Sequence, residues 1–206
     1  MTSGSEGGER RAASRLTPIP VGDRPTHRAA EGFKYCPLCA TELAWLQQAE
    51  DGGPSVRLRC PACNFTHWNN PTPVLAAVIE CADRGGQVLL ARNAAWPGRF
   101  FGLITGFMEA GETPEEGIRR EVAEETSLQV DQLSLLGVWD FQRMNQIIIA
   151  YHATARGEIV LSPELAEYKL MAPEKIRCWP AGTGQALATW LRSKGIEPQW
   201  LDMKPS

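Results

Sequence analysis

The pattern of apolar and polar residues changes twice along this chain of 206 residues. Residues 1–31 are rich in Gly, Ser, Pro and Arg and show no apolar periodicity, which is typical of a flexible tail. Residues 32–72 combine paired cysteines with turn residues. From residue 73 to residue 206, apolar runs alternate with helix-like segments. We therefore expect a tail, a small module and one larger domain.

The larger domain contains several apolar runs of strand length. They lie at 74–82, 87–92, 100–105, 133–141 and 146–155. The first two runs are nearly continuous, as in strands buried on both faces, and the turn Asp83-Arg84-Gly85-Gly86 joins them into a hairpin. Helical spacing of apolar residues predicts helices over 114–126 and 185–194. This alternation predicts an α/β domain in which helices cover a mixed sheet.

Composition and charge exclude several classes of protein. With 43% apolar and 22% charged residues, the chain resembles an ordinary soluble protein. Its net charge of −3 offers little general attraction to nucleic acid or anionic lipid. No apolar run approaches the roughly 18 to 20 residues that span a bilayer, and the N-terminus lacks the apolar stretch of a secretory signal. We expect a cytoplasmic protein without a membrane partner.

Four cysteines form two pairs of identical spacing. Cys36 and Cys39 are separated by two residues, as are Cys60 and Cys63. Two such knuckles predict a closed, tetrahedral Zn²⁺ site with a structural role. A zinc ion would supply folding free energy to a module too small to form a core alone. The alternative, two disulfides, requires an oxidising compartment that nothing else in the sequence indicates.

The helix predicted over 114–126 has a well-marked start. Thr113 suits the N-cap, Pro114 suits the first helical position, and Glu116 can close a capping box with Thr113. Glu115 and Glu116 also lie at the positive end of the helix dipole. Helix stability alone accounts for these two acids.

Three further acids lie near the end of the same helix. Glu121, Glu124 and Glu125 stand at i, i+3 and i+4, so they share one face. Like charges at this spacing cost a few tenths of a kcal/mol, and acids in the last turn oppose the dipole by ~0.3–1 kcal/mol each. Clusters of oxygen ligands suit Mg²⁺ or Mn²⁺ bound together with phosphates. The pattern favours a divalent metal site over a solvated acidic face.

The segment from Gly106 to Leu128 resembles the Nudix box, G-x5-E-x7-R-E-U-x-E-E-x-G-U, in which U is aliphatic. Ser127 departs from the motif, because it stands where the family has Gly. That position follows the helix, where a left-handed cap favours Gly. The resemblance implies a Nudix α/β/α sandwich and hydrolysis of nucleoside diphosphates linked to another moiety, with Mg²⁺ (or Mn²⁺) as cofactor.

The resemblance also implies roles for individual residues. The implied Mg²⁺ or Mn²⁺ ligands are Glu121, Glu124, Glu125 and the Gly106 carbonyl. Glu112 and Arg120 match the pair that braces the preceding loop against the helix and orients Glu121.

A general base is also required, and several acids could act as one. Glu121 is one candidate. Glu167, from the region after the box, is another, with Glu164 and Glu158 as substitutes if the placement differs.

A four-cysteine ribbon before a Nudix domain is similar to the NADH pyrophosphatase branch, some members of which remove the NAD cap of RNA, and to a related FAD pyrophosphatase branch. The branch's signature SQPWPFPxS is replaced here by GVWDFQRMNQIIIAYHA. The resemblance leaves NAD(H)-like dinucleotides, FAD and ADP-ribose open as substrates, and it is consistent with a homodimer. Among the aromatic residues, Trp96 and Phe107 are the best candidates for substrate binding.

A second hypothesis belongs to another class. The ribbon could make the protein a nucleic-acid-binding regulator in which the Nudix domain senses a nucleotide. Basic and acidic side chains balance within the ribbon, and four thiolates with Zn²⁺ add negative charge, so no basic stripe results. We therefore expect a small-molecule diphosphate as partner, and no nucleic acid other than capped RNA.

Overall fold

The computed structural model describes residues 17–18, 32–96 and 98–202. The predicted tail, residues 1–31, lies outside the described residues except for Thr17–Pro18, which form a short strand. The chain divides into two compact units, Met1–Asn70 and Pro71–Ser206.

The N-terminal unit contains a four-stranded antiparallel sheet in the order β1-β2-β3-β4. Its strands are β1 (Thr17–Pro18), β2 (Ala44–Glu50), β3 (Gly53–Arg59) and β4 (Thr66–His67). The chain reverses between β2 and β3 at Asp51-Gly52, where the turn residues stand. The main core cluster of the unit is small: its buried members are Cys36, Leu43, Leu58 and Cys60, and Leu46 is also buried. So few buried side chains contribute little to stability without a further cross-link.

The C-terminal unit is built on a mixed sheet in the order β10-β6-β5-β9-β8, and β7 also pairs with β5. Its strands are β5 (Thr72–Cys81), β6 (Gln87–Asn93), β7 (Ile104–Phe107), β8 (Gln129–Phe141), β9 (Gln146–Arg156) and β10 (Leu165–Met171). Short 3-10 helices cover Ala82–Arg84, Gln142–Met144 and Pro173–Lys175. β5 runs parallel to β9, whereas β5 pairs with β6 and β7 in the antiparallel sense. The predicted mixed sheet is confirmed, and the apolar run in β5 is explained by its central position.

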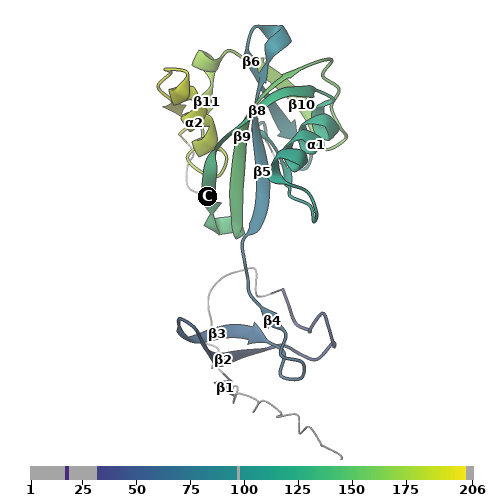
Figure 1. Ribbon diagram of the computed structural model, residues 1–206. Coiled ribbons are helices and arrows are strands. Elements are labelled where there is room, and N and C mark those ends of the chain that lie inside the picture. Colours follow the sequence, from purple (N-terminus) through teal and green to yellow (C-terminus); the bar gives the residue numbers. More distant parts are fainter. Residues whose placement is uncertain (1–16, 19–31, 97, 203–206) are drawn as a thin grey trace, which may run out of the picture. The chain divides into compact units, whose positions relative to one another are not determined.

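Two helices cover opposite faces of this sheet, as Figure 1 shows. α1 (Pro114–Thr126) packs its apolar side against Leu75 and Ile79 of β5. α2 (Gly184–Ser193) belongs to a separate core cluster that includes Val78 of β5. Alternating residues of one strand thus serve both layers, and the α/β/α sandwich is confirmed. No helix among the described residues is long and apolar enough to cross a membrane.

Two strand predictions differ from the structure. The strand predicted over 100–105 begins only at Ile104 in the structure. Before it, Gly102 forms a single isolated bridge with Ala91 and no continuous ladder. β10 was not among the predicted strands, and the sequence had left this region open as loop or strand. It pairs only with β6, at the edge of the sheet, and its four consecutive exposed residues, 166–169, do not alternate with buried ones. A short parallel pair, β11 (Arg177–Cys178) and β12 (Gln199–Trp200), completes the unit.

Both ends of α1 follow the sequence prediction. The capping box is present, since the Glu116 N–H donates to Thr113 Oγ1 at 3.2 Å and the Thr113 N–H donates to Glu116 Oε2 at 2.8 Å. At the other end, Ser127 adopts the left-handed conformation with φ 59°, and its N–H donates to the Ala123 carbonyl. A serine therefore occupies backbone geometry that favours glycine.

We predict that Ser127→Gly stabilises the protein by about 0.5–1 kcal/mol, because glycine adopts positive φ without steric cost. The gain is limited by the loss of the Ser127 Oγ hydrogen bond to the Val160 carbonyl, at 3.3 Å. Denaturant unfolding measures the change. Ser134→Gly, on β8, is the matched control and should lower stability, because glycine weakens a strand. A loss of stability in Ser127→Gly would contradict the prediction.

Candidate metal and substrate site

α1 lies against β7 so closely that one side chain occupies the space beside a glycine. A Cβ atom on Gly106 would lie 1.8 Å from Cδ of Glu121 and 2.1 Å from its Oε1. No residue with a side chain can therefore stand at position 106 while Glu121 keeps its place. Gly106 is held in turn by the pairing of β7 with β5, opposite Leu75.

Arg120 connects the acids of this region. Its Nε and Nη2 atoms donate to both oxygens of Glu112, at 3.1 and 2.9 Å. Its Nη1 donates to Glu121 Oε1 at 2.8 Å and to Glu124 Oε2 at 3.1 Å. The bidentate contact with Arg120 is the main reason that the pKa of Glu112 lies below its usual range. The loop that carries Glu112 is thus tied to the helix, and two acids of the helix have a partial counter-charge.

Glu125 lacks such a partner. The residue is 9% exposed, and its carboxylate makes no hydrogen bond or ion pair among the described residues. Burial, followed by the charges of Glu121, Glu164 and Glu124, raises the pKa of Glu125 to about 7. A buried carboxylate whose charged neighbours are acids is stabilised either by a proton or by a bound cation.

The donor atoms of the acidic face suit a hard cation, since they are carboxylate oxygens. Among the described residues, however, only the cysteines bring three or more ligand atoms within 4.8 Å of one another. The carboxylates do not converge in this way, because Glu121 and Glu124 point to Arg120. The residues fit a divalent cation in type, and Glu125 is the one left uncompensated.

The predicted acid Glu167 lies on the other face of the sheet from the hollow described below. Leu165 pairs with Asn93, but a bulge shifts the register so that Glu167 pairs with Arg92. Consecutive residues of a strand point to opposite faces, so the bulge turns Glu167 away from the side of Leu165. Arg92 Nε donates to Glu167 Oε1 at 2.8 Å, and this bond lowers the pKa of Glu167. Periodicity in the sequence could not show this one-residue shift.

A hollow lies beside Glu125. Its lining residues are Ala91, Asn93, Trp96, Leu103, Thr105, Glu125 and Leu165. Trp96 is 42% exposed, and its ring packs against Phe100 with centroids 5.9 Å apart. Phe107 is also exposed, but it does not belong to the described lining, and its carbonyl accepts a hydrogen bond from Arg120 at 3.2 Å. The structure therefore places Trp96, and not Phe107, in the lining of the same hollow as Glu125.

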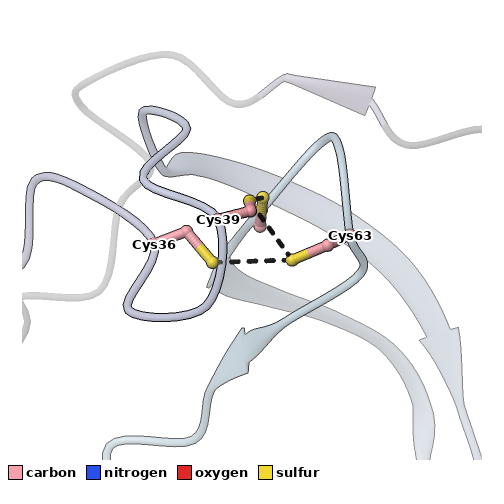
Figure 2. Close-up of side chains that lie close together, drawn as sticks. Cys36, Cys39 and Cys63 are labelled. Carbon is pink, nitrogen blue, oxygen red and sulfur yellow. Dashed lines mark hydrogen bonds between the residues drawn. The ribbon is translucent and has the colours of Figure 1, made fainter.

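The four cysteines of the N-terminal unit converge, and Figure 2 shows three of them with their sulfurs directed at one another. The sulfurs of Cys36 and Cys63 are 3.5 Å apart, as are those of Cys39 and Cys60. A disulfide requires about 2.05 Å. A tetrahedral Zn²⁺ with Zn–S bonds of about 2.3 Å places its sulfurs about 3.8 Å apart. The cluster thus fits a zinc ion and not two disulfides.

Both arginines of the ribbon form ion pairs with Glu50. Arg57 donates to both oxygens of Glu50, at 2.8 Å each, and Arg59 also contacts Glu50. The hydrogen bond from Arg57 is the largest cause that lowers the pKa of Glu50 to about 2. These pairs reduce the positive charge that a nucleic-acid surface would need.

Comparison with known proteins agrees with this geometry. Residues 71–192 match the family described as NUDIX domain. The chain is 30% identical over 128 residues to an NAD-capped RNA hydrolase, NudC, of Pseudomonas aeruginosa, covering 62% of this chain and 43% of that protein. It is 34% identical over 116 residues to the human mitochondrial NAD(P)H pyrophosphatase NUDT13, covering 55% of this chain and 32% of that protein. Both alignments span less than half of the relative's length.

Solved structures show the same architecture. A crystal structure of a NUDIX hydrolase from Nitrosomonas europaea is 26% identical, with a TM-score of 0.64, and the match covers 82% of this chain and 97% of that chain. A MutT protein from Methanosarcina mazei Go1 is 23% identical with a TM-score of 0.51, covers 62% of this chain, and supports the fold alone.

We predict that Gly106→Ala displaces the Glu121 carboxylate and lowers the affinity for Mn²⁺ by about tenfold or more, since one charged ligand contributes on the order of 1–3 kcal/mol. Mn²⁺ titration followed by electron paramagnetic resonance measures the affinity. Gly102→Ala is the matched control, because its Cβ would meet only ordinary contacts, the nearest at 3.4 Å. Equal affinities in the two variants would contradict the steric argument.

Proposed function

The chain belongs to the NUDIX family, and on this premise we propose that it is a Mg²⁺-dependent pyrophosphohydrolase. Its substrate is the diphosphate of a dinucleotide or nucleoside diphosphate derivative. The observation that carries the proposal is Glu125, a buried carboxylate that is exposed to the charges of other acids and has no hydrogen-bond or ion-pair partner among the described residues. Relatives named as an NAD-capped RNA hydrolase and an NAD(P)H pyrophosphatase support an NAD-like substrate, with FAD and ADP-ribose as further members of the class.

The proposed Mg²⁺ ligands are Glu121, Glu124, Glu125 and the Gly106 carbonyl. When bound, Mg²⁺ would polarise the phosphate oxygens and lower the pKa of the attacking water. Arg120 orients Glu121 and, through Glu112, holds the loop before the helix. Because Arg120 compensates part of the acidic face, the repulsion that remains is concentrated at Glu125.

The remaining roles concern the substrate and the proton. Trp96, exposed at the edge of the hollow, can stack on a base or nicotinamide ring. Glu121 stays a candidate for general base, and Glu164 is another, because its charge acts on Glu125. Glu167 points away from the hollow and accepts a hydrogen bond from Arg92, so it is the weaker candidate.

We predict that the full chain with Mg²⁺ hydrolyses at least one member of a panel of NADH, FAD and ADP-ribose to mononucleotide products, identified by chromatography. Glu124→Gln should lower kcat on the order of 100-fold, because a ligand to the catalytic cation is lost. Glu109→Gln, an exposed acid of the preceding loop, is the matched control and should keep the activity. An inactive wild-type protein, or a fully active Glu124→Gln variant, would refute the proposal.

We further propose that the cysteine cluster binds a structural Zn²⁺. Native mass spectrometry should then find one zinc ion per chain, and Cys39→Ser should abolish it. Because the metal provides much of the folding free energy of so small a unit, amide hydrogen exchange in Met1–Asn70 should accelerate while that in Pro71–Ser206 stays slow. Cys178→Ala, a buried cysteine of the other unit, should retain the zinc. Unchanged exchange in Cys39→Ser would argue against a structural metal.

A further inference from the structure

Asn93 is the last residue of β6, and its side chain points into the hollow beside Glu125. Ala91 lies two positions earlier on β6, so the two side chains share a face of the sheet. Leu165 of β10 pairs with Asn93 and faces the same way. All three residues line the hollow together with Glu125. The core cluster that buries Ala91 and Leu165 also contains the apolar side of α1, so this is the face that α1 covers.

A hydrogen bond in the turn after β6 determines which end of the Asn93 carboxamide is free. The Ala95 N–H donates to Asn93 Oδ1 at 2.8 Å, and the Trp96 N–H donates to the Asn93 carbonyl at 3.2 Å. A backbone N–H can only donate, so the side-chain atom that it meets is the amide oxygen. The Nδ2 group makes no hydrogen bond among the described residues. Asn93 therefore presents two free N–H donors to the hollow, while its oxygen is already bonded.

Backbone hydrogen bonds hold this turn in place relative to α1. The Ala94 N–H donates to the Glu164 carbonyl at 2.7 Å, and the Ser162 N–H donates to the Glu125 carbonyl at 3.0 Å. The segment from Ser162 to Glu164 thus connects the end of α1 with the turn that carries the Asn93 carboxamide. Donors that are fixed before a ligand arrives lose little conformational entropy when it binds.

The chemistry of the hollow selects the kind of group that Asn93 can bind. An asparagine with both ends free recognises a base or an amide through two hydrogen bonds, but with Oδ1 engaged it can only donate. The partner is then an acceptor, such as a phosphate oxygen. Asn93 is neutral, so it does not compete with a cation at Glu125. The empty volume of the hollow is about 240 Å³, on the order of eight water molecules at ~30 Å³ each, which is enough for a phosphate group.

We propose that Asn93 Nδ2 donates a hydrogen bond to a non-bridging oxygen of the substrate's diphosphate. The inference rests on the proposed function and deepens it, because it adds a substrate-binding residue from outside the segment Gly106–Leu128. A purely structural role of Asn93 in the turn would require only its Oδ1 atom. The two roles therefore separate when the NH₂ group is removed and an oxygen acceptor is kept.

Calorimetry on the full chain with Mg²⁺ and methylenebisphosphonate, a diphosphate that cannot be hydrolysed, tests the proposal. Asn93→Ser retains an oxygen that can accept from the Ala95 N–H but lacks the NH₂ group. Its affinity for the bisphosphonate should fall about tenfold or more, as expected when a hydrogen bond to a charged group is lost. Its affinity for Mn²⁺ alone, measured by electron paramagnetic resonance, should stay unchanged.

Asn93→Asp gives a second signature, because it replaces the donors with a negative oxygen of the same shape. Affinity for the bisphosphonate should fall further than in Asn93→Ser, whereas affinity for Mn²⁺ alone should be equal or higher. A side chain that only held the turn would not produce these opposite effects. Gln132→Glu, which changes an exposed carboxamide of β8 outside the hollow in the same way, is the matched control and should alter neither affinity.

The binding measurements do not depend on turnover, so the two proposals can fail separately. Weaker bisphosphonate binding in both Asn93 variants supports the inference even if the wild-type protein hydrolyses no dinucleotide, which would refute the proposed function alone. Wild-type affinity for the bisphosphonate in Asn93→Ser would overturn the inference and leave the proposed function intact. An equal loss of Mn²⁺ affinity in that variant, or no bisphosphonate binding by the wild-type protein, would also overturn it.

Discussion

The docking of α1 onto the sheet determines the site. Ile118 and Val122 are fully buried, and their packing against β5 fixes both the depth and the rotation of the helix. Once this apolar stripe is packed, the positions of Glu121, Glu124 and Glu125 on the same helix are fixed as well. Glu121 is pressed against the backbone of Gly106, and Glu125 is carried below the surface. The free energy of apolar burial thus supports an arrangement of charges that an isolated helix would avoid.

The acids of α1 and of the loop before it are not equally compensated by positive charge. Arg120 bonds Glu112, Glu121 and Glu124, and each bond is charge-assisted. Glu125 stays outside this network and retains a proton more readily than an ordinary acid. A divalent cation can stabilise such a carboxylate, which the guanidinium of Arg120 does not contact. The same arginine holds the loop against the helix and leaves the carboxylate of Glu125 without a counter-charge.

The two units differ in the size of their apolar core clusters. The C-terminal unit has extensive core clusters on both faces of its sheet, so its fold rests on apolar burial. Among the described residues, the N-terminal unit has a small core cluster, and two of its buried members, Cys36 and Cys60, belong to the group of four converging cysteines. Its sulfurs are spaced for a zinc ion, and a metal bound there would add the cross-link that so small a core needs.

The sequence by itself determined the elements whose signals are local. The bounds of α1 and its capping box follow from residues within one or two turns of each other, and the hairpin of β5 and β6 follows from two apolar runs and one turn. The spacing of the four cysteines predicted their cluster, since each knuckle closes within four residues. The left-handed cap at Ser127 was expected from the resemblance to the Nudix box, which has Gly at this position, and Ser127 adopts that conformation.

Only the tertiary structure decided which functional residues come into contact or become buried. The burial of Glu125, the steric demand at Gly106 and the contact of Trp96 with the hollow depend on elements far apart in the chain. The bulge before Glu167 reverses the face of that side chain, yet it is a shift in pairing with β6 and leaves no periodic trace in β10. Periodicity describes how a segment repeats along its own axis. Register and burial are relations between segments, and they are set by packing across the whole domain.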